Sequence, residues 1–476
     1  MGQEIDGSHF KKQDFQRFLA RLKQETALLG QWFAAQRFDT EHTVAGFELE
    51  AWLVDKHCLP APINAEFLHA MANPRLSPEL ASFNVEFNYT PRGLQGSALT
   101  DMQAEMTDLW QQGSQVANQL ESQLVMIGIL PTVDETYLTL QHISAMNRYR
   151  ALNEQVLRLR QGRPMELNIL GVDHLKTSHR NVMFESAATS FQIHLQVPLP
   201  LAVRAYNASL IVSAATVAVS ANSPFLCGKN LWAETRVPLF EQAVQAGGYE
   251  SGAHGPMRRV TFGSGYLHES VLECFCENLE HYPVLLPELS DDPPEKFSTV
   301  RLHNGTLWRW NRPLIGFANN QAHIRIEHRV IPAGPSVIDA VANAAFYFGL
   351  VSQLMRREIQ PELQLPFNQS RDNFYDAAKF SYDGHMVWLD GNKSNIRTLI
   401  LKELLPIAAQ GLAAAGIDAH AIDTYLGIIE QRTQNACNGA AWQRAFTTRH
   451  GQDLSSLTKA YIERQNSGAP VHEWGI

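Results

Sequence analysis

Residues 43–55 read TVAGFELEAWLVD, and their alternation of apolar and polar side chains predicts a β-strand. Phe47 and Leu49 lie on the apolar face of this strand, and Glu48 and Glu50 lie on the opposite face. Neighbouring residues on one face of a strand are about 7 Å apart, and no basic side chain alternates with the two glutamates. Because two carboxylates that close repel each other unless a cation lies between them, this face is a candidate metal site.

Two further segments repeat this pattern. Residues 84–90 (NVEFNYT) place Glu86 opposite their apolar face, and Glu79 lies on the approach to this strand. Residues 190–197 (SFQIHLQV) place His194 between two glutamines on the polar face. A sheet with one face in water would explain any single strand of this kind, but repeated carboxylates together with one imidazole favour a shared site.

A fourth predicted strand adds positive charge. Residues 323–332 (HIRIEHRVIP) place His323, Arg325, Glu327 and Arg329 on one face. Carboxylates with one imidazole suit Mg²⁺ or Mn²⁺, and interleaved arginines suit phosphate and carboxylate groups. Phosphoryl transfer needs this combination, because metal ions neutralise phosphate oxygens and arginine holds the charge that spreads onto the transferring group.

Composition and motifs exclude several other classes. The chain of 476 residues has 39 Lys+Arg against 48 Asp+Glu and a formal charge of -9, which disfavours a general nucleic-acid binder. Gly228 and Lys229 are followed by Asn230, where a phosphate-binding P-loop needs Ser or Thr. The Gly-x-Ser-x-Gly elbow of serine hydrolases and the HExxH helix of zinc proteases do not occur.

Cysteine usage and hydropathy predict a soluble cytoplasmic protein. The five cysteines are odd in number and scattered, which indicates a reducing compartment. No apolar segment follows Lys11 and Lys12 as in a signal peptide, and the most apolar stretch, residues 208–221, is shorter than the roughly 20 residues of a spanning helix. We therefore expect the protein to bind small molecules and neither nucleic acid nor a membrane. A homo-oligomer is compatible with the sequence.

The order of the predicted elements indicates an α+β fold with a mainly antiparallel sheet, since long helical segments rather than short βαβ units separate the strands. We expect three parts: an N-terminal helix packed on the catalytic domain (1–40), a sheet domain (41–355) and a mainly helical C-terminal region (356–476). Residues 158–190 are predicted to be a long loop that covers the site. Helices are predicted over residues 14–36, 99–130, 337–355, 396–415 and 419–435, and strands over 299–312 and 323–331.

Four motifs in this order resemble the glutamate–cysteine ligase family. They are residues 46–50 (GFELE), the pair Glu79 and Glu86 leading into residues 88–91 (NYTP), residues 189–194 (TSFQIH) and residues 324–329 (IRIEHR). The resemblance covers roughly residues 40–350. It implies a curved, glutamine synthetase-like antiparallel sheet with helices on its outer face, and membership of the carboxylate-amine ligases.

The resemblance also implies an activity. ATP phosphorylates the γ-carboxylate of glutamate, and an amine attacks the acyl phosphate, with cysteine giving γ-glutamylcysteine. Mg²⁺, or Mn²⁺ in its place, would be the cofactor and ATP the co-substrate. The residues that correspond to the family's metal ligands are Glu48, Glu50, Glu79, Glu86, His194 and Glu327.

The resemblance further implies roles for arginines. Arg329 corresponds to the arginine that contacts phosphate and acts with Glu327, while Arg236, Arg301 and Arg325 are the predicted substrate-binding residues. The family often has Asp at the position of Glu79. Its Gly-Thr-x-Glu-x-Arg strand is not reproduced at residues 305–310, so the Glu-x-Arg pair is placed at residues 327–329.

Other functions remain open at the level of the sequence. A ligase of the same fold with another acid or amine is compatible with these motifs, because acceptor pockets lie in variable loops. A protein that binds nucleotide or metal without catalysis is a second alternative. A metal-dependent hydrolase is disfavoured because two-metal hydrolytic sites usually contain more His and Asp. No residue in the motifs is an evident base for the amine.

Overall fold

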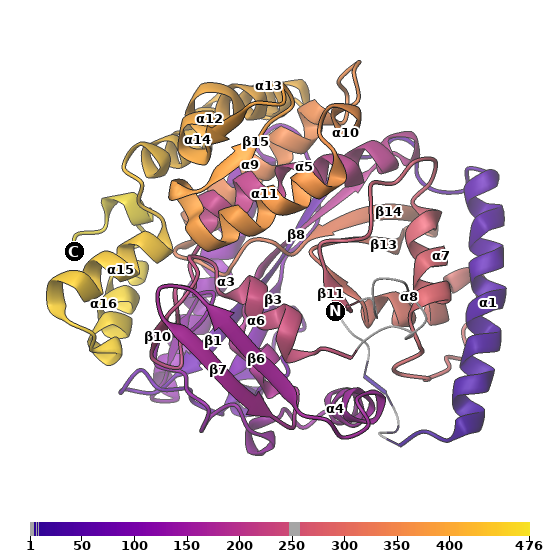
Figure 1. Ribbon diagram of the computed structural model, residues 1–476, viewed down its shortest axis with the longest axis horizontal. Helices are drawn as coiled ribbons and strands as arrows, with labels where there is room; N and C mark the ends of the chain where they lie inside the picture. Colours follow the sequence, from indigo (N-terminus) through magenta and orange to yellow (C-terminus); the bar gives the residue numbers. More distant parts are fainter. Residues whose placement is uncertain (1–3, 6, 8, 247–257) are drawn as a thin grey trace.

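The structure is a computed structural model that describes the chain except residues 1–3, 6, 8 and 247–257. Its centre is an eight-stranded sheet in which every pairing is antiparallel (Figure 1). Six strands are hydrogen-bonded in the order β13 (Asn311–Ala318), β14 (Gln321–His328), β8 (Phe191–Val197), β1 (Val44–Val54), β3 (Asn84–Asn88) and β2 (Leu76–Pro78). The other two, β4 (Arg92–Gly93) and β5 (Gln123–Val125), pair with β1.

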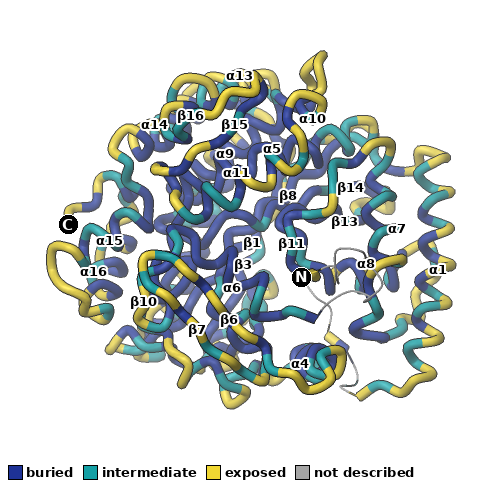
Figure 2. Tube along the Cα trace, in the orientation of Figure 1, coloured by how far each residue is buried: buried dark blue, intermediate teal, exposed yellow. Residues whose placement is uncertain are grey.

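Both faces of the central strands are covered by protein. β8 is buried at all seven positions, and β1 is buried at ten of its eleven. Figure 2 shows the same burial around β1, β3 and β8. The polar face of the sheet is therefore not a wet surface, so solvent exposure does not explain why carboxylates lie there.

Two apolar helices cover the other face of the sheet. α5 (Ala202–Ser220) contacts β13 and β14, and α9 (Val337–Leu354) contacts β8 (Figure 1). By length and composition alone, the segments Leu199–Ser220 and Val337–Leu354 are long and apolar enough to cross a membrane. The sequence analysis was therefore wrong to treat the apolar stretch around residues 208–221 as too short for a spanning helix. Their most apolar windows are 89% and 83% buried inside the fold, which accounts for their composition as core helices.

The C-terminal region is helical, as predicted. α11 (Phe367–Phe380) packs on α5, while α13 (Leu405–Ala414) and α14 (Ala419–Gln434) pack on α9. A β-carbon at Gly411 would lie 1.9 Å from the carbonyl oxygen of Gly349, so glycine is needed where α13 crosses α9. α15 (Gly439–His450) and α16 (Leu454–Asn466) complete this end of the molecule (Figure 1).

The N-terminal helix α1 (Lys12–Ala34) packs along α7 (Leu272–His281) and α8 (Ser298–Gly305). Glu25 of α1 accepts the backbone N–H groups of Thr299 and Val300 at 3.0 and 3.1 Å, and so caps α8. The main cluster of buried apolar side chains includes residues from Ile5 to Trp474 and so crosses the predicted boundaries at residues 40 and 355. The division of the chain into three parts at these boundaries stays a prediction.

Two predicted elements, besides the predicted loop described below, differ in the structure. The helix predicted for residues 99–130 is α3 (Ala98–Gln119), and the chain then enters β5. The strand predicted over 299–312 is α8 followed by β12 (Trp308–Arg309) and the start of β13. The sequence pattern failed there because Glu25, distant in sequence, supplies the cap that stabilises the first turn of α8.

The segment predicted as a loop contains regular structure. α4 (Asn147–Leu159) leads into a hairpin of β6 (Met165–Leu170) and β7 (His174–His179), followed by the 3₁₀ turn Met183–Ala187. The hairpin packs on α6 (Arg236–Ala243). Its polar strands looked like a loop because one side faces solvent (Figure 2). The remaining elements are α2 (Asn64–Met71), α10 (Pro361–Gln364), α12 (Ile396–Leu399), β9 (Phe225–Leu226), β10 (Lys229–Asn230), β11 (Val260–Thr261), β15 (His385–Val387) and β16 (Lys393–Asn395).

Candidate active site

The strand register brings the predicted ligands onto one buried face of the sheet. Glu327 lies directly opposite His194 across β14 and β8, and Glu50 lies directly opposite Glu86 across β1 and β3. The six residues form two groups whose ligand atoms lie within 4.8 Å of one another. We call Glu48, His194 and Glu327 the arginine-paired cluster, and Glu50, Glu79 and Glu86 the carboxylate cluster.

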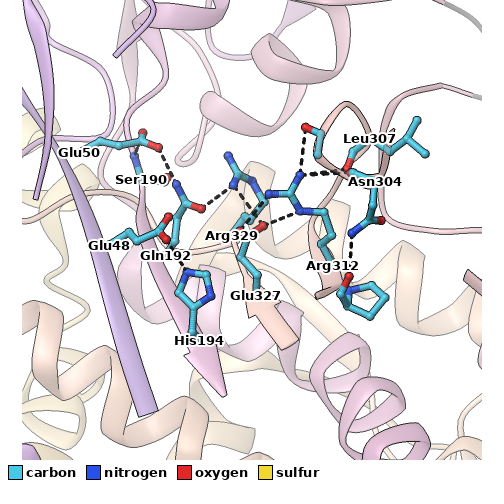
Figure 3. Close-up of polar contacts among 12 residues, drawn as sticks. Glu48, Glu50, Ser190, Gln192, His194, Asn304, Leu307, Arg312, Glu327 and Arg329 are labelled. Atoms are coloured by element: carbon cyan, nitrogen blue, oxygen red, sulfur yellow. Dashed lines mark hydrogen bonds and ion pairs between the residues drawn. The ribbon is translucent and has the colours of Figure 1, made fainter. Parts of the chain in front are cut away.

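Two guanidinium groups, those of Arg312 and Arg329, lie beside Glu327 of the arginine-paired cluster (Figure 3). Arg312 donates from Nε and Nη2 to the two oxygens of Glu327, each at 2.9 Å, and Arg329 Nη1 lies 3.2 Å from Glu327 Oε2. Burial alone would raise the pKa of Glu327, but the charges of Arg312 and Arg329 outweigh it and hold that pKa well below its usual value. Glu327 is therefore ionised at neutral pH.

Arg312 was not among the predicted residues. Besides binding Glu327, its Nη1 donates to the backbone carbonyls of Asn304 and Gly305 at 3.4 and 3.3 Å, which are at the end of α8. Arg312 lies opposite Glu327 in the β13–β14 register. The sequence analysis treated residues 299–312 as one strand and so did not pair Arg312 with Glu327. Placing the hairpin turn between β13 and β14 correctly would have predicted this pair.

Gln192 connects the two clusters. Its Nε2 donates to Glu50 Oε1 at 2.8 Å, and its Oε1 accepts a hydrogen bond from Arg329 Nη1 (Figure 3). The backbone N–H of Ser190 donates to Glu50 Oε2 at 2.7 Å. The sequence analysis placed Gln192 on the polar face of its strand but gave it no role in the site. A glutamine beside potential metal ligands has no sequence pattern that would reveal such a role.

The carboxylate cluster contains little positive charge. Glu86 accepts hydrogen bonds from Ser77 Oγ at 3.1 Å and Asn88 Nδ2 at 3.0 Å. Burial, together with the charges of Glu86 and Glu50, raises the pKa of Glu79 well above its usual value. Burial also raises the pKa of Glu50, although Arg329 opposes the shift. A cation bound between neighbouring carboxylates would oppose such shifts, because it favours their charged form.

The donor sets differ in their fit to a divalent cation. Three buried carboxylates within 4.8 Å suit Mg²⁺, which prefers oxygen ligands. His194 fits less simply. Arg325 Nε donates to its Nδ1 at 3.2 Å, so the ring proton lies on Nε2, which points at Glu48 Oε1 at 3.2 Å. Metal binding at Nε2 would require that proton to leave and Arg325 to release Nδ1.

The predicted substrate-binding arginines lie in different surroundings. Arg325 contacts His194 directly, as described above. Arg236 begins α6 and is buried, and its Nη1 lies 3.0 Å from Glu234 Oε1. Arg301 is exposed on α8, and its side chain makes no hydrogen bond or ion pair with the residues that the structure describes. Its charge contributes to lowering the pKa of Arg325, after the larger effect of burial, so it lies near that residue without joining the clusters.

A pocket opens beside the two clusters. Glu50, Arg236 and Arg329 line it. Its remaining lining residues are Glu185, Ala188, Ser190, Phe240 and Trp310. Glu185 and Ala188 belong to the segment predicted to cover the site, and the structure places this end of it against the clusters.

The sequence matches the model of glutamate-cysteine ligase family 2 over residues 44–463, which is most of the chain. The chain belongs to this family. The predicted family is thereby confirmed, and the family and fold indicate a carboxylate-amine ligase. No curated protein matches the sequence.

Two solved structures with a similar fold are described by their names as ligase or synthetase enzymes. The glutamate–cysteine ligase of Francisella tularensis in complex with AMP has a TM-score of 0.55 at 10% identity, over 90% of each chain. A bifunctional glutathione synthetase from Pasteurella multocida has a TM-score of 0.53 at 11% identity, over 89% of this chain and 53% of that chain. At these identities the likeness shows the fold, and the predicted α+β class with its antiparallel sheet is confirmed.

Proposed function

We propose that the protein is an ATP- and Mg²⁺-dependent ligase that phosphorylates the γ-carboxylate of glutamate and couples it to an amine, with cysteine as the proposed amine. The observation that carries this proposal is the pair of buried clusters on one sheet face, joined by Gln192 and flanked by Arg329. Family membership and the AMP complex of the similar Francisella enzyme support it. The first product would be γ-glutamylcysteine.

The carboxylates are the proposed metal ligands. Glu50, Glu79 and Glu86 would hold one Mg²⁺, and Glu48 and Glu327, with His194 after loss of its Nε2 proton, would hold another. Bound Mg²⁺ would neutralise phosphate oxygens of ATP. Mn²⁺ has similar ligand preferences and would replace it.

Arg329 is the proposed phosphate-contacting residue. Its Nη1 is fixed by Gln192 and Glu327, while its Nε is buried with no hydrogen-bond partner in the described structure. A guanidinium held in this way needs no reorganisation as charge develops on a transferring phosphoryl group. Arg325, which contacts His194, and the nearby Arg301 are also proposed to bind substrate.

The acyl phosphate must be protected from water, since it hydrolyses readily. Glu185 of the 3₁₀ turn Met183–Ala187 lines the pocket, and we propose that this turn excludes water. Arg236, also in the pocket wall, would bind a carboxylate of the substrate. A cytoplasmic setting is also part of the proposal, because the five cysteines are odd in number and scattered along the sequence, unlike a secreted disulfide framework.

Turnover with a panel of amines tests the proposal. Purified protein with ATP, Mg²⁺ and glutamate should release ADP when the correct amine is added, and Glu50→Gln should abolish this release. Exposed Glu166, on the outer side of β6, provides the matched control Glu166→Gln, which should keep full activity. ATP binding without ADP release across all amino acids and common amines would instead indicate the non-catalytic alternative, and release with another acid would indicate a related ligase.

A further inference from the structure

The start of α4 is anchored beside the carboxylate cluster. Just before this helix, the backbone N–H of Ser144 donates to the carbonyl of Leu80 at 2.9 Å, and the Ser144 hydroxyl donates to the carbonyl of Glu79. In the first turn of α4, the hydroxyl of Tyr149 donates to the carbonyl of Pro78 at 3.1 Å. These contacts hold α4 against the segment that carries Glu79, and so fix the helix relative to the proposed metal ligands.

Arg148 is a basic residue of this anchored turn. Its guanidinium lies over the ring of Tyr149, 4.4 Å from the ring centre, and its Nη2 donates to the Tyr149 hydroxyl. Its Nε is buried and has no hydrogen-bond partner in the described part of the chain. Arg148 is partly buried, whereas Arg150 on the same helix is exposed. The guanidinium is therefore held by Tyr149, whose hydroxyl also contacts the residue before Glu79.

The charge of Arg148 acts on the carboxylate cluster. Burial alone would lower the pKa of Arg148, but Tyr149 and the charges of Glu79 and Glu86 raise it above its usual value. The pKa of Glu79 is raised chiefly by burial, and the charge of Arg148 opposes that shift. Arginine stays protonated in proteins. The cluster therefore faces a fixed positive charge that comes from α4 and not from the sheet.

We propose that Arg148 sets the metal affinity of the carboxylate cluster, because its positive charge repels a divalent cation bound by these three glutamates. The inference rests on the proposed function, which has Mg²⁺ bound by Glu50, Glu79 and Glu86. The repulsion acts through space, so Arg148 is not itself a ligand. Mg²⁺ at this site would then be weakly held and would exchange with solution.

Calorimetric titration of the full-length protein with Mg²⁺ at pH 8, without nucleotide, tests the inference without turnover. Arg148→Gln should lower the Kd for Mg²⁺ by about tenfold, as expected when one unit charge near a divalent ion is removed. Arg148→Lys keeps the charge and should stay within about threefold of wild type. The matched control is Arg150→Gln, which should change the Kd by less than about twofold, because solvent screens an exposed charge.

Two further variants protect the comparison. Thermal unfolding identifies a variant that does not fold. Arg148→Met, which keeps an apolar stem over the Tyr149 ring, should lower the Kd as Arg148→Gln does and replaces it if that variant does not fold. The decrease should disappear when Arg148→Gln is combined with Glu86→Gln, because the second change removes a ligand of the carboxylate cluster. A decrease that persists there would place the ion elsewhere and overturn the inference.

The remaining outcomes separate this inference from the proposed function. An unchanged or higher Kd in Arg148→Gln would overturn the inference and leave the ligase intact. The same decrease in Arg148→Lys or in Arg150→Gln would also overturn it, since neither result depends on the charge of Arg148. The expected decrease in a protein that releases no ADP with any amine would overturn the proposed activity alone. A complete absence of Mg²⁺ binding in wild type and variants would overturn both.

Discussion

The two acidic clusters lie on the same sheet face, at similar burial, yet their carboxyl groups have opposite electrostatic surroundings. In the arginine-paired cluster, Arg312 and Arg329 hold the pKa of Glu327 well below its usual value despite burial. In the carboxylate cluster, burial and neighbouring carboxylates hold the pKa of Glu79 well above its usual value. Burial alone therefore does not decide the charge of this face.

The strand register explains the difference. Arg312 lies directly opposite Glu327 across β13 and β14, whereas Glu50 lies directly opposite Glu86 across β1 and β3. Opposite charges in such positions stabilise a sheet and like charges destabilise it. Arginines therefore already offset the charge of Glu327 within the protein, whereas the carboxylate cluster would gain more from the proposed cation.

Removing the positive charge that pairs with Glu327 should have the largest effect on stability. Arg312→Met removes two hydrogen bonds from a buried carboxylate and should lower the free energy of unfolding by about 3–5 kcal/mol, measured by urea denaturation. Arg371, whose pair with Asp372 is exposed, is the matched control, and Arg371→Met should cost less than about 1 kcal/mol. Equal losses in the two variants would contradict the stabilising role of Arg312.

Binding of Mg²⁺ at the proposed site should have the next largest effect. Mg²⁺ at about 100 times its Kd should raise the free energy of unfolding of the wild-type protein by about 2.7 kcal/mol, measured by thermal or urea unfolding. Glu86→Gln should lose most of this gain, because it removes a carboxylate from the carboxylate cluster. The control Glu166→Gln should retain it. The same gain in Glu86→Gln would place the cation elsewhere.

A smaller effect of opposite sign is expected in the metal-free protein. Glu79→Gln removes one of three crowded charges and should raise the free energy of unfolding by roughly 1 kcal/mol at pH 8, on the scale of one unit of pKa. The same chemical change at Glu327 should lower stability, since it breaks the pairs with Arg312 and Arg329. Urea denaturation of both variants measures the contrast, and a loss of stability in Glu79→Gln would contradict it.

The pH dependence of stability should separate the clusters in the metal-free protein. Because folding lowers the pKa of Glu327, its contribution is present above the ordinary pKa of about 4.3 and is lost as the pH falls further. Because folding raises the pKa values of Glu79 and Glu50, their contribution decreases as the pH rises from about 4.3 through the raised values. The melting temperature should therefore fall both below pH 4 and toward pH 8, and Mg²⁺ should remove the second fall. A melting temperature that rises steadily from pH 5 to pH 8 without metal would contradict this account.

Several features of the site were predictable from strand periodicity. Alternation in residues 43–55 and 190–197 places Glu48, Glu50 and His194 on one face, and the structure has them there. Periodicity does not give the register between strands, so the direct pairing of Glu327 with Arg312 could not be read from either segment alone.

Other features depend on contacts between distant parts of the chain. Glu185 lies in a polar segment with no regular pattern, and its place in the pocket follows from the packing of the 3₁₀ turn on α6. The α8 helix depends on a cap from Glu25, about 270 positions earlier in the chain. Sequence patterns that act over a few residues cannot report such contacts.

Transfer of oxygen tests the central claim most directly. Glutamate labelled with ¹⁸O in its γ-carboxylate is incubated with the protein, ATP, Mg²⁺ and cysteine, and the released phosphate is analysed by mass spectrometry. If the γ-carboxylate is phosphorylated and the amine displaces the phosphate, each phosphate released should carry one ¹⁸O from glutamate. Phosphate without the label, released at the same rate with or without the amine, would show that water receives the phosphoryl group and would contradict the ligase.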